Sequence, residues 1–366
     1  MDTEAFIHHI STLPNYGGQI AHIEHIRPLE ADYGRLDGAL AAPLAVCLKE
    51  NGLLPLYSHQ AQAINSALSG QNVMVATSSA SGKTLCYNVP VLQALLTEPG
   101  SRALYLFPTK ALAQDQLRGL QQIFGPVLKG DEIDTFDGDT PQPERAAIRR
   151  KARIVLTNPD MLHLGILPNH QSWAGLLKHL RYVVVDEAHS YRGVFGSHVA
   201  NVLRRLRRLC RIYGSSPQFI VCSATINNPG EHAGKLSGLP FTVVEADGSP
   251  SGGKDFVFWN PPLIDEAKGM RASANNESSA LFSQLVSRDI RTLDFTRSRR
   301  LTEIIFKYSR QRLLEENPAQ AARIKPCHCP DGQVDPLPFF EVPDREVNRP
   351  LETRVHIRRR RPEVFG

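Results

Sequence analysis

The sequence predicts an α/β fold, in which a doubly wound parallel sheet is covered by helices on both faces. The first observation is that short apolar segments alternate with segments of helical period, as in parallel sheets whose strands are connected by helices. The second is a loop of small residues, ATSSASGKT at residues 76–84, between an apolar segment and a helical one. The third is an apolar segment that ends in two carboxylates, YVVVDE at residues 182–187. Since ligands of such sheets bind at the carboxyl ends of the strands, the loop and the carboxylates are expected at one edge.

Six short apolar segments are predicted to form the strands. They are Asn72–Ala76, Ala103–Phe107, Ile133–Phe136, Arg153–Leu156, Arg181–Val185 and Gln218–Cys222. Helices are predicted where apolar residues recur with helical period. These helices are Leu40–Lys49, His59–Leu68, Thr84–Leu96 and Ala111–Phe124. A further strand at Arg291–Phe295 and a helix at Ser298–Leu314 indicate the beginning of a second α/β domain.

The composition is that of a globular chain with room for two domains. With 366 residues and 42% hydrophobic content, the chain can bury at least one large core. A net charge of +5 and a pI near 8.9 permit a polyanionic partner without requiring one. The six cysteines are scattered and four stand in apolar patterns, which favours a reducing cytoplasm. No apolar segment reaches the length of a membrane span, so no membrane partner is expected.

Residues 76–84 have the composition of a phosphate-binding loop. Small residues let backbone N–H groups curl around a β-phosphate, a lysine reaches the β and γ oxygens, and a hydroxyl coordinates Mg²⁺. Thr77 stands where such loops usually have their first glycine, so an ordinary Ser/Gly-rich turn is the alternative. The residues expected to hold a nucleoside triphosphate are Thr77, Ser78, Ser79, Ala80, Ser81, Gly82, Lys83 and Thr84.

The two carboxylates supply the second half of a nucleotide site. Asp186 is expected to hold the water shell of Mg²⁺, and Glu187 to position and deprotonate the attacking water. An acidic loop after any strand is the alternative for Asp186 alone, but it explains poorly the phosphate loop upstream. Mg²⁺ is the only metal expected, with Thr84 and Asp186 as its protein ligands.

Two residues ahead of the loop suit an adenine base. The side-chain amide of Gln60 can both donate to and accept from the edge of the base. The ring of Tyr57 can pack on its face. Taken alone, this segment is also an ordinary helix start.

Polar loops follow the remaining predicted strands. Hydroxyls, a lysine and helix N-termini at strand ends are suited to a sugar-phosphate backbone whose bases are not read. Ordinary helix capping is the alternative for Thr109 and Asn158. Ser223, Ala224 and Thr225 follow the last strand, and the hydroxyls of Ser223 and Thr225 can bond to the acidic motif and relay the nucleotide state. The candidate nucleic-acid contacts are Pro108, Thr109, Lys110, Gln114, Asp137, Asp139, Thr157, Asn158 and Asp160.

The ordered motifs resemble those of superfamily 2 helicases of the DEAD/DEAH type. They read YSHQ at 57–60, ATSSASGKT at 76–84, PTKALAQDQ at 108–116, TNPDMLH at 157–163, DEAH at 186–189 and SAT at 223–225. LYSHQ at 56–60, FDGDT at 136–140 and DEAHSYRGVFGSH at 186–198 look like the RecQ-like DNA repair branch, which includes the bacterial mitomycin repair helicase. The resemblance covers about residues 20–326.

This resemblance implies ATP-driven translocation on single-stranded DNA, with 3′ to 5′ unwinding by two RecA-like domains. Its catalytic residues fall on Lys83, Asp186, Glu187 and His189. The string TLDFTRSRR at 292–300 resembles the first motif of the second domain, although Asp294 replaces an apolar residue. There, Ser298 and Arg299 are the implied nucleic-acid contacts. The expected partner is single-stranded DNA or DNA with a 3′ tail; RNA is left open, and no protein partner is predicted.

The motifs divide the chain into five expected segments. They are a lead-in at 1–55, a RecA-like ATP-binding domain at 56–246, a connecting segment at 247–290, the beginning of a second RecA-like domain at 291–326 and an irregular tail at 327–366. The tail holds six prolines and seven arginines where the family has an arginine-bearing catalytic motif, so we expect it to fold poorly. A frame-shifted or truncated gene is the hypothesis for its origin.

Two other functions are left open by the sequence. A P-loop kinase would share Lys83, but it would not need the motifs at 109–110 and 223–225. A non-enzymatic remnant would bind ATP and nucleic acid without turnover. The basic run at 204–211 is interpreted as the solvated face of a core helix, because Leu203 and Leu206 recur at helical spacing.

Overall fold

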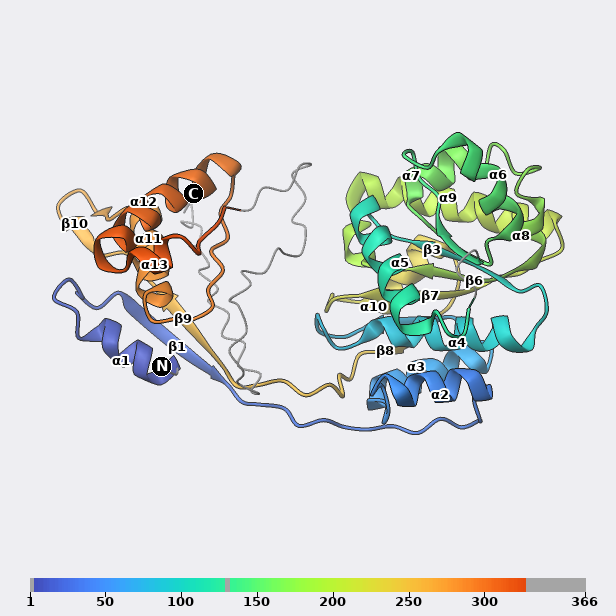
Figure 1. The fold of residues 1–366 in the computed structure, drawn as a ribbon, viewed down its shortest axis with the longest axis horizontal. Coiled ribbons are helices and arrows are strands. Elements are labelled where there is room, and N and C mark those ends of the chain that lie inside the picture. Colours follow the sequence, from blue (N-terminus) through green and yellow to red (C-terminus); the bar gives the residue numbers. More distant parts are fainter. Residues whose placement is uncertain (1–2, 129–131, 327–366) are drawn as a thin grey trace. The chain divides into compact units, whose positions relative to one another are not determined.

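The computed structural model describes residues 3–128 and 132–326, which form two compact units (Figure 1). One unit comprises residues 30–250, and the other combines residues 3–29 with residues 251–326. The division differs from the expected lead-in at 1–55 and connecting segment at 247–290. The reason is that β1 (Ile20–Ile26) pairs antiparallel with β9 (Lys254–Trp259), so Ile20 lies opposite Trp259. None of the described helices is both long enough and apolar enough to cross a membrane.

The unit of residues 30–250 is built on a parallel sheet of seven strands in the order β4-β5-β3-β6-β7-β2-β8. The predicted fold class is therefore confirmed. The strands are β2 (Val73–Ala76), β3 (Arg102–Leu106), β4 (Ile133–Thr135), β5 (Ile154–Thr157), β6 (Leu180–Val185), β7 (Gln218–Ser223) and β8 (Thr242–Val244). All six predicted strands are present. Most of their ends differ from the predicted bounds by one residue, and none differs by more. β8 was not predicted, because it has only three residues and two of them are half-buried.

Helices cover both faces of this sheet, and strand side chains alternate between two cores. Val73 and Val75 of β2 belong to one core, whereas Met74 and Ala76 belong to the other. The first core is completed by α2 (Ala42–Glu50), α3 (Ser58–Leu68), α4 (Lys83–Thr97) and α5 (Lys110–Phe124). The second is completed by α6 (Gln142–Lys151), α8 (Ala174–His179), α9 (Gly193–Ile212) and α10 (Pro229–Ser237). The four helices predicted by residue range in this unit correspond to α2, α3, α4 and α5, which complete the first core.

A short α-helix, a π-helix and a 3₁₀-helix complete the unit. They are α7 (Pro159–Met161), η2 (Leu162–Ile166) and η3 (Ala188–Ser190). In α9, Leu203, Leu206 and Cys210 are buried, as the helical spacing predicts. Two of its arginines do more than face solvent: Arg204 and Arg207 donate to the carbonyls of Lys235 and Ser237 at the end of α10, each at 2.8 Å.

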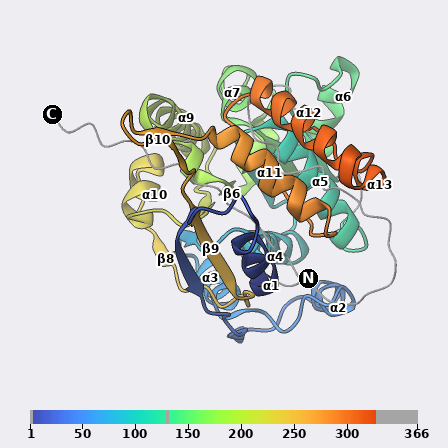
Figure 2. The same cartoon turned by 90° about the vertical axis from the view of Figure 1, so that its left-hand side faces the viewer.

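The second unit is mostly helical. Beside α1 (Thr3–Ser11) and the pair β1 and β9, it contains β10 (Leu263–Asp265), β11 (Met270–Arg271), α11 (Ala274–Val286), α12 (Arg299–Glu316) and α13 (Pro318–Ala321). Figures 1 and 2 show α11 and α12 side by side. Their buried Ser279 and Ser309 hydroxyls are 3.0 Å apart and hydrogen-bonded.

The expected second-domain strand is wrong, whereas the helix after it is confirmed. Residues 291–295 form no strand. Instead, the Asp294 carboxylate accepts a hydrogen bond of 2.6 Å from Ser278 of α11, and no strand lies beside it among the described residues. The polar side chain thus ties the segment to a helix rather than to a sheet. The irregular tail predicted at 327–366 lies outside the described residues.

Removal of a buried side chain in the central sheet tests this packing. Leu104 of β3 is 0% exposed, so Leu104→Ala should lower the free energy of unfolding by about 2–5 kcal/mol. Leu164 is 69% exposed, and Leu164→Ala should stay within about 0.5 kcal/mol. Urea unfolding followed by fluorescence measures both. A Trp259→Phe background leaves the buried Trp173 as the sole tryptophan reporter of this unit. Equal losses for the two variants would contradict the assigned core.

Candidate nucleotide and nucleic-acid site

The parallel sheet brings the predicted nucleotide residues to one edge. β6, β7 and β2 are neighbours, so their carboxyl ends point the same way. The phosphate loop follows β2, the two carboxylates follow β6, and Ser223 ends β7. This shared edge is where an open α/β sheet binds its ligands.

The phosphate loop has a backbone shaped for an anion. Ala80 and Gly82 have φ of 64° and 78°, in the left-handed region. Thr77 does not have positive φ, so this position needs no glycine; its buried hydroxyl lies 2.7 Å from that of Ser81. Among the described residues, the N–H groups of residues 79–84 have no acceptor, and the first to donate is that of Leu85, to Gly82. Free N–H groups at a helix N-terminus suit a phosphate.

Lys83 lies inside this loop. Its ammonium donates to the carbonyls of Thr77 at 3.2 Å and Ser78 at 2.5 Å. Thr84 follows in the first turn of α4 and is half-buried. A phosphate oxygen carries more negative charge than a carbonyl oxygen, so a bound phosphate can draw the ammonium away.

Asp186 is a buried carboxylate at 8% exposure. Burial, and then the neighbouring charge of Glu187, raises the pKa of Asp186 to about 6. Its oxygens accept from the Glu187 N–H at 2.8 Å and from the Tyr87 hydroxyl at 3.0 Å. The Tyr87 hydroxyl also lies 3.2 Å from the amide oxygen of Gln116. A carboxylate that is costly to ionise without a partner fits a cation ligand.

The sequence pattern does not predict a role for Tyr87 or Gln116. Each stands in a helical segment, where the sequence pattern cannot distinguish a polar group that contacts the site from one on the surface or in the core. The usable signal was the position of Tyr87, one helical turn after Lys83, on the helix that starts at the phosphate loop.

Glu187 and His189 form a polar pair beside Asp186. Glu187 has φ of 51°, a conformation that costs energy for a residue with a side chain. Its carboxylate lies 3.1 Å from Nδ1 of His189. The same nitrogen lies 3.4 Å from the buried hydroxyl of Ser223. The structure therefore joins the predicted catalytic and coupling residues through His189, whereas Ala224 is half-buried and Thr225 is exposed.

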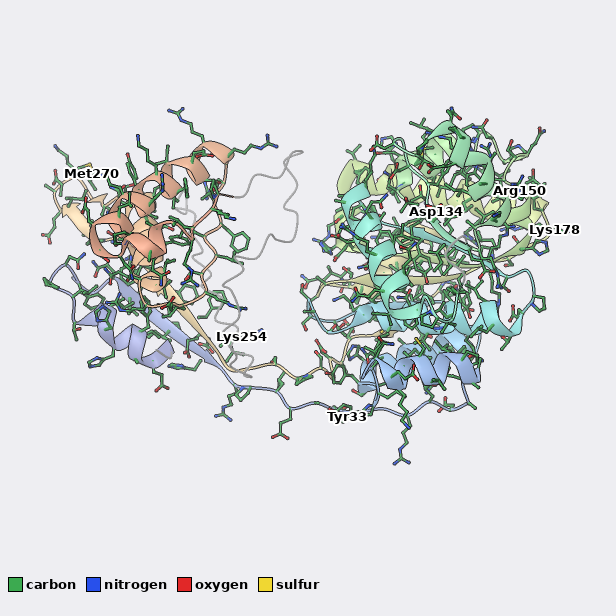
Figure 3. The ribbon with its side chains drawn as sticks, in the orientation of Figure 1. Tyr33, Asp134, Arg150, Lys178, Lys254 and Met270 are labelled. Carbon is green, nitrogen blue, oxygen red and sulfur yellow. The ribbon has the colours of Figure 1, made fainter. Side chains whose placement is uncertain are left out.

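The candidate adenine residues contact the phosphate loop. Gln60 is 3% exposed, accepts from the Tyr57 N–H at 3.0 Å and donates to the Gly82 carbonyl at 3.1 Å. The Tyr57 ring stacks on Tyr33 at 5.7 Å between centroids. Tyr33, labelled in Figure 3, was not predicted, because it lies 24 residues earlier in an irregular segment (57 − 33 = 24). An adenine contact by Gln60 stays a prediction.

One pocket of about 390 Å³ gathers several candidate nucleic-acid residues, namely Lys110, Gln114, Asp137 and Asp139. Lys110 donates to Asp139 at 2.8 Å, and Gln114 donates to the Thr135 hydroxyl at 2.9 Å. The lining also contains Asp134, labelled in Figure 3, and burial raises the pKa of that carboxyl. With one lysine among several carboxylates, the lining suits sugar hydroxyls or base amino groups better than phosphates.

The other candidates do not line this pocket. Thr109 and Asn158 are helix N-caps, since their side chains accept from Leu112 at 3.2 Å and Met161 at 2.7 Å, as the capping interpretation predicts. The buried Thr157 hydroxyl donates to the Phe136 carbonyl at 2.6 Å.

Three further candidates occupy other positions. Pro108 is half-buried before α5, and Asp160 is exposed in α7. In the other unit, Ser298 is the N-cap of α12 and accepts from Leu301 at 3.3 Å, and Arg299 begins that helix. A nucleic-acid role for any of them remains a prediction.

Comparison with known proteins gives one family and a group of related helicases. A family model described as DEAD/DEAH box helicase matches residues 57–232. The chain is 44% identical over 297 residues to the ATP-dependent helicase YprA of Bacillus subtilis, a match that covers 81% of this chain and 40% of YprA. It is 44% identical over 305 residues to the ATP-dependent helicase HRQ1 of Saccharomyces cerevisiae, which covers 82% of this chain and 28% of HRQ1.

A solved structure agrees with these relatives. The DUF1998 helicase MrfA bound to DNA and AMPPNP matches with a TM-score of 0.81 and 42% identity, over 87% of this chain and 44% of that chain. The chain thus spans less than half the length of the proteins it matches. Residues 57–232 are therefore a DEAD/DEAH box helicase domain, and the chain is related to the YprA and Hrq1 helicases.

Proposed function

We propose that the chain binds and hydrolyses ATP as part of an ATP-dependent DNA helicase. The observation that carries the proposal is the meeting of the Lys83 loop, with its free N–H groups, and the carboxylates Asp186 and Glu187 at one sheet edge. The helicases YprA and HRQ1 are described as ATP-dependent, and MrfA has been solved with DNA and AMPPNP, which supports ATP and DNA as ligands here.

In this proposal each residue has a distinct task. The N–H groups of residues 79–84 cradle the β-phosphate, and Lys83 leaves the loop carbonyls for the β and γ oxygens. Thr84 and Asp186 would hold Mg²⁺, which would supply charge neutralisation for the phosphates. No cluster of three or more His, Cys, Asp or Glu side chains able to hold a metal occurs in residues 3–128 or 132–326. The nucleotide and water would then provide most of the Mg²⁺ ligands.

The remaining residues activate the attacking water, connect the nucleotide site to β7, and bind the adenine and the DNA. Glu187 accepts the proton of the attacking water, and His189 holds the Glu187 carboxylate at 3.1 Å. His189 Nδ1 also lies 3.4 Å from the Ser223 hydroxyl. A change of charge at Glu187 would therefore alter the hydrogen bond between His189 and the end of β7. Gln60 and Tyr57 take the adenine. Single-stranded DNA or DNA with a 3′ tail is the proposed polymer, held by the loops after β3, β4 and β5.

The free and buried cysteines fit a reducing cytoplasm for this activity. Cys47, Cys86, Cys210 and Cys222 are unpaired and buried. Burial raises the pKa of the Cys86 thiol to about 12, which keeps it protonated and unreactive.

Substitution of Lys83 tests the proposed ATP hydrolysis. Lys83→Ala removes a charge-assisted hydrogen bond worth about 1.5–3 kcal/mol, so affinity for Mg·ATP should fall by about tenfold or more. Turnover, measured as phosphate release with and without single-stranded DNA, should be stimulated by DNA in the natural chain and lost in the variant. Lys178→Ala, on the exposed surface of α8, is the matched control and should behave as the natural chain.

The alternatives give different results in the same assay. Natural turnover no faster than that of Lys83→Ala, with ATP still bound, would contradict hydrolysis and leave a binding module. Parallel reactions with a 3′-tailed duplex and with single-stranded RNA identify the stimulating polymer.

The pH dependence of stability tests the buried carboxylate. The folded pKa of Asp186, about 6, lies above its ordinary value of 3.8, so ionisation costs stability. The contribution of the neutral form is complete below about pH 4 and is lost as the pH rises through 6. Asp186→Asn cannot ionise, so without nucleotide it should be more stable than the natural chain at pH 8, by up to about 3 kcal/mol. Below pH 4 this difference should disappear.

Urea unfolding at the two pH values measures this difference. Asp115→Asn, in an exposed ion pair with Arg118, is the control and should change stability by less than about 1 kcal/mol at either pH. Asp186→Asn should also lose Mg²⁺-dependent ATP binding, because an amide is a poorer Mg²⁺ ligand than a carboxylate. An Asp186→Asn variant less stable than the natural chain at pH 8 would contradict the raised pKa.

A further inference from the structure

The segment that follows β8 contacts the phosphate loop through Asp247. One oxygen of this carboxylate accepts from the Ser78 N–H at 3.1 Å and also from the Ser78 hydroxyl. The other oxygen accepts from the Ser249 N–H at 2.9 Å and the Ser249 hydroxyl at 2.6 Å. Partial burial works against the charge, but the hydrogen bonds from Ser249 and Ser78 prevail and lower the pKa of Asp247 to about 2. Each oxygen of the Asp247 carboxylate therefore accepts two hydrogen bonds. The sequence alone predicts only a connecting segment at this position.

A buried histidine makes a second connection between the same two segments. The Gly248 N–H donates to Nδ1 of His59 at 3.2 Å, so the ring proton is assigned to Nε2. Nε2 then donates to the Ser81 carbonyl at 3.0 Å. His59 is 1% exposed, and burial lowers its pKa despite the nearby Asp247 charge. The neutral ring thus bridges the loop and residue 248.

The backbone around Gly248 is tightly packed against a third segment. The Asp32 N–H donates to the Gly248 carbonyl at 2.9 Å, and the Ser58 N–H donates to the Asp32 carbonyl at 2.8 Å. A Cβ at Gly248 would lie 2.8 Å from the Asp32 carbonyl oxygen and closer still to the Ser58 hydroxyl. Only glycine allows this approach. Residues 30–33, 58–59 and 247–249 are therefore held together beside the phosphate loop.

We propose that Asp247 and His59 are positioning residues that fasten the phosphate loop to residues 247–249. The inference rests on the proposed nucleotide function. When a phosphate draws Lys83 away from the carbonyls of Thr77 and Ser78, Asp247 still holds Ser78 and His59 still holds Ser81. The loop thus keeps its shape while its lysine changes partners.

This fastening also has a consequence along the chain. The unit of residues 30–250 is joined covalently to the rest of the chain only at its two ends, after Leu29 and after Pro250. Both ends begin within a few residues of the fastened segments at 30–33 and 247–249. The contacts of Asp247, Gly248 and Asp32 therefore hold the chain near both connections beside the phosphate loop.

A double-mutant cycle in the full chain tests the Asp247 contact. Asp247→Ala should weaken the affinity for a fluorescent ATP analogue with Mg²⁺ by about tenfold, equivalent to about 1.4 kcal/mol. Ser78→Ala keeps its N–H and should lose less. In the Asp247→Ala background, Ser78→Ala should cause no further loss. Asp247→Asn retains acceptor oxygens and should partly restore affinity, and Glu231→Ala, an exposed acid paired with Lys235, should bind as the natural chain does.

Hydrogen exchange without nucleotide separates this inference from the proposed function. In Asp247→Ala, the hydrogen-bonded amides of Ser78, Gly248, Ser249 and Asp32 should exchange at least several-fold faster than in the natural chain or in Glu231→Ala. If the natural chain bound no ATP analogue, the proposed function would fail. The exchange rates alone would then show whether Asp247 fastens the phosphate loop to residues 247–249. Unchanged exchange in Asp247→Ala, or equal losses from Ser78→Ala in both backgrounds, would overturn it.

Discussion

The parallel register of three neighbouring strands is the constraint on which the site depends. Ala76 lies opposite Ser223, and Val185 lies opposite Val221, so β2, β7 and β6 end within one or two residues of each other. This backbone pairing places an ammonium, two carboxylates and a hydroxyl at one edge of the sheet. A slip of one residue in such a strand would turn its side chains to the opposite face. The two buried cores hold the register, because alternate side chains of each strand pack into different cores.

Electrostatics at this edge are arranged for a ligand that carries both signs of charge. Lys83 satisfies its ammonium on two carbonyls, and Asp186 is buried with a raised pKa beside Glu187. Both arrangements are poorer than those a phosphate and a divalent cation would offer. Binding therefore needs Lys83 to exchange its carbonyl partners for phosphate oxygens, whereas the surrounding loop and carboxylates are already at the same edge. The positive φ of Glu187 belongs to the same pattern, in which local strain is held by surrounding structure.

Local sequence predicted the central sheet and most of the side chains that meet at its carboxyl edge. Each motif there consists of a few consecutive residues, such as the glycine and lysine of the loop. Their residue types indicate the chemistry without knowledge of distant contacts. Contacts between distant residues were not predictable in this way. The partner of Ser78 is Asp247, in a segment whose composition indicates only a loop, and β1 pairs with a strand more than 200 residues away. The strand expected at 291–295 failed for a related reason, since Asp294 found a partner on α11 that sequence pattern cannot reveal.

A crystal structure of the chain with Mg²⁺ and a non-hydrolysable ATP analogue would test the proposed ATP site directly. We expect the Lys83 ammonium to contact the β and γ phosphate oxygens and no longer the carbonyls of Thr77 and Ser78, with Asp186 beside the metal. A nucleotide bound elsewhere, with Lys83 still on those carbonyls, would contradict the central claim that this sheet edge is an ATP site.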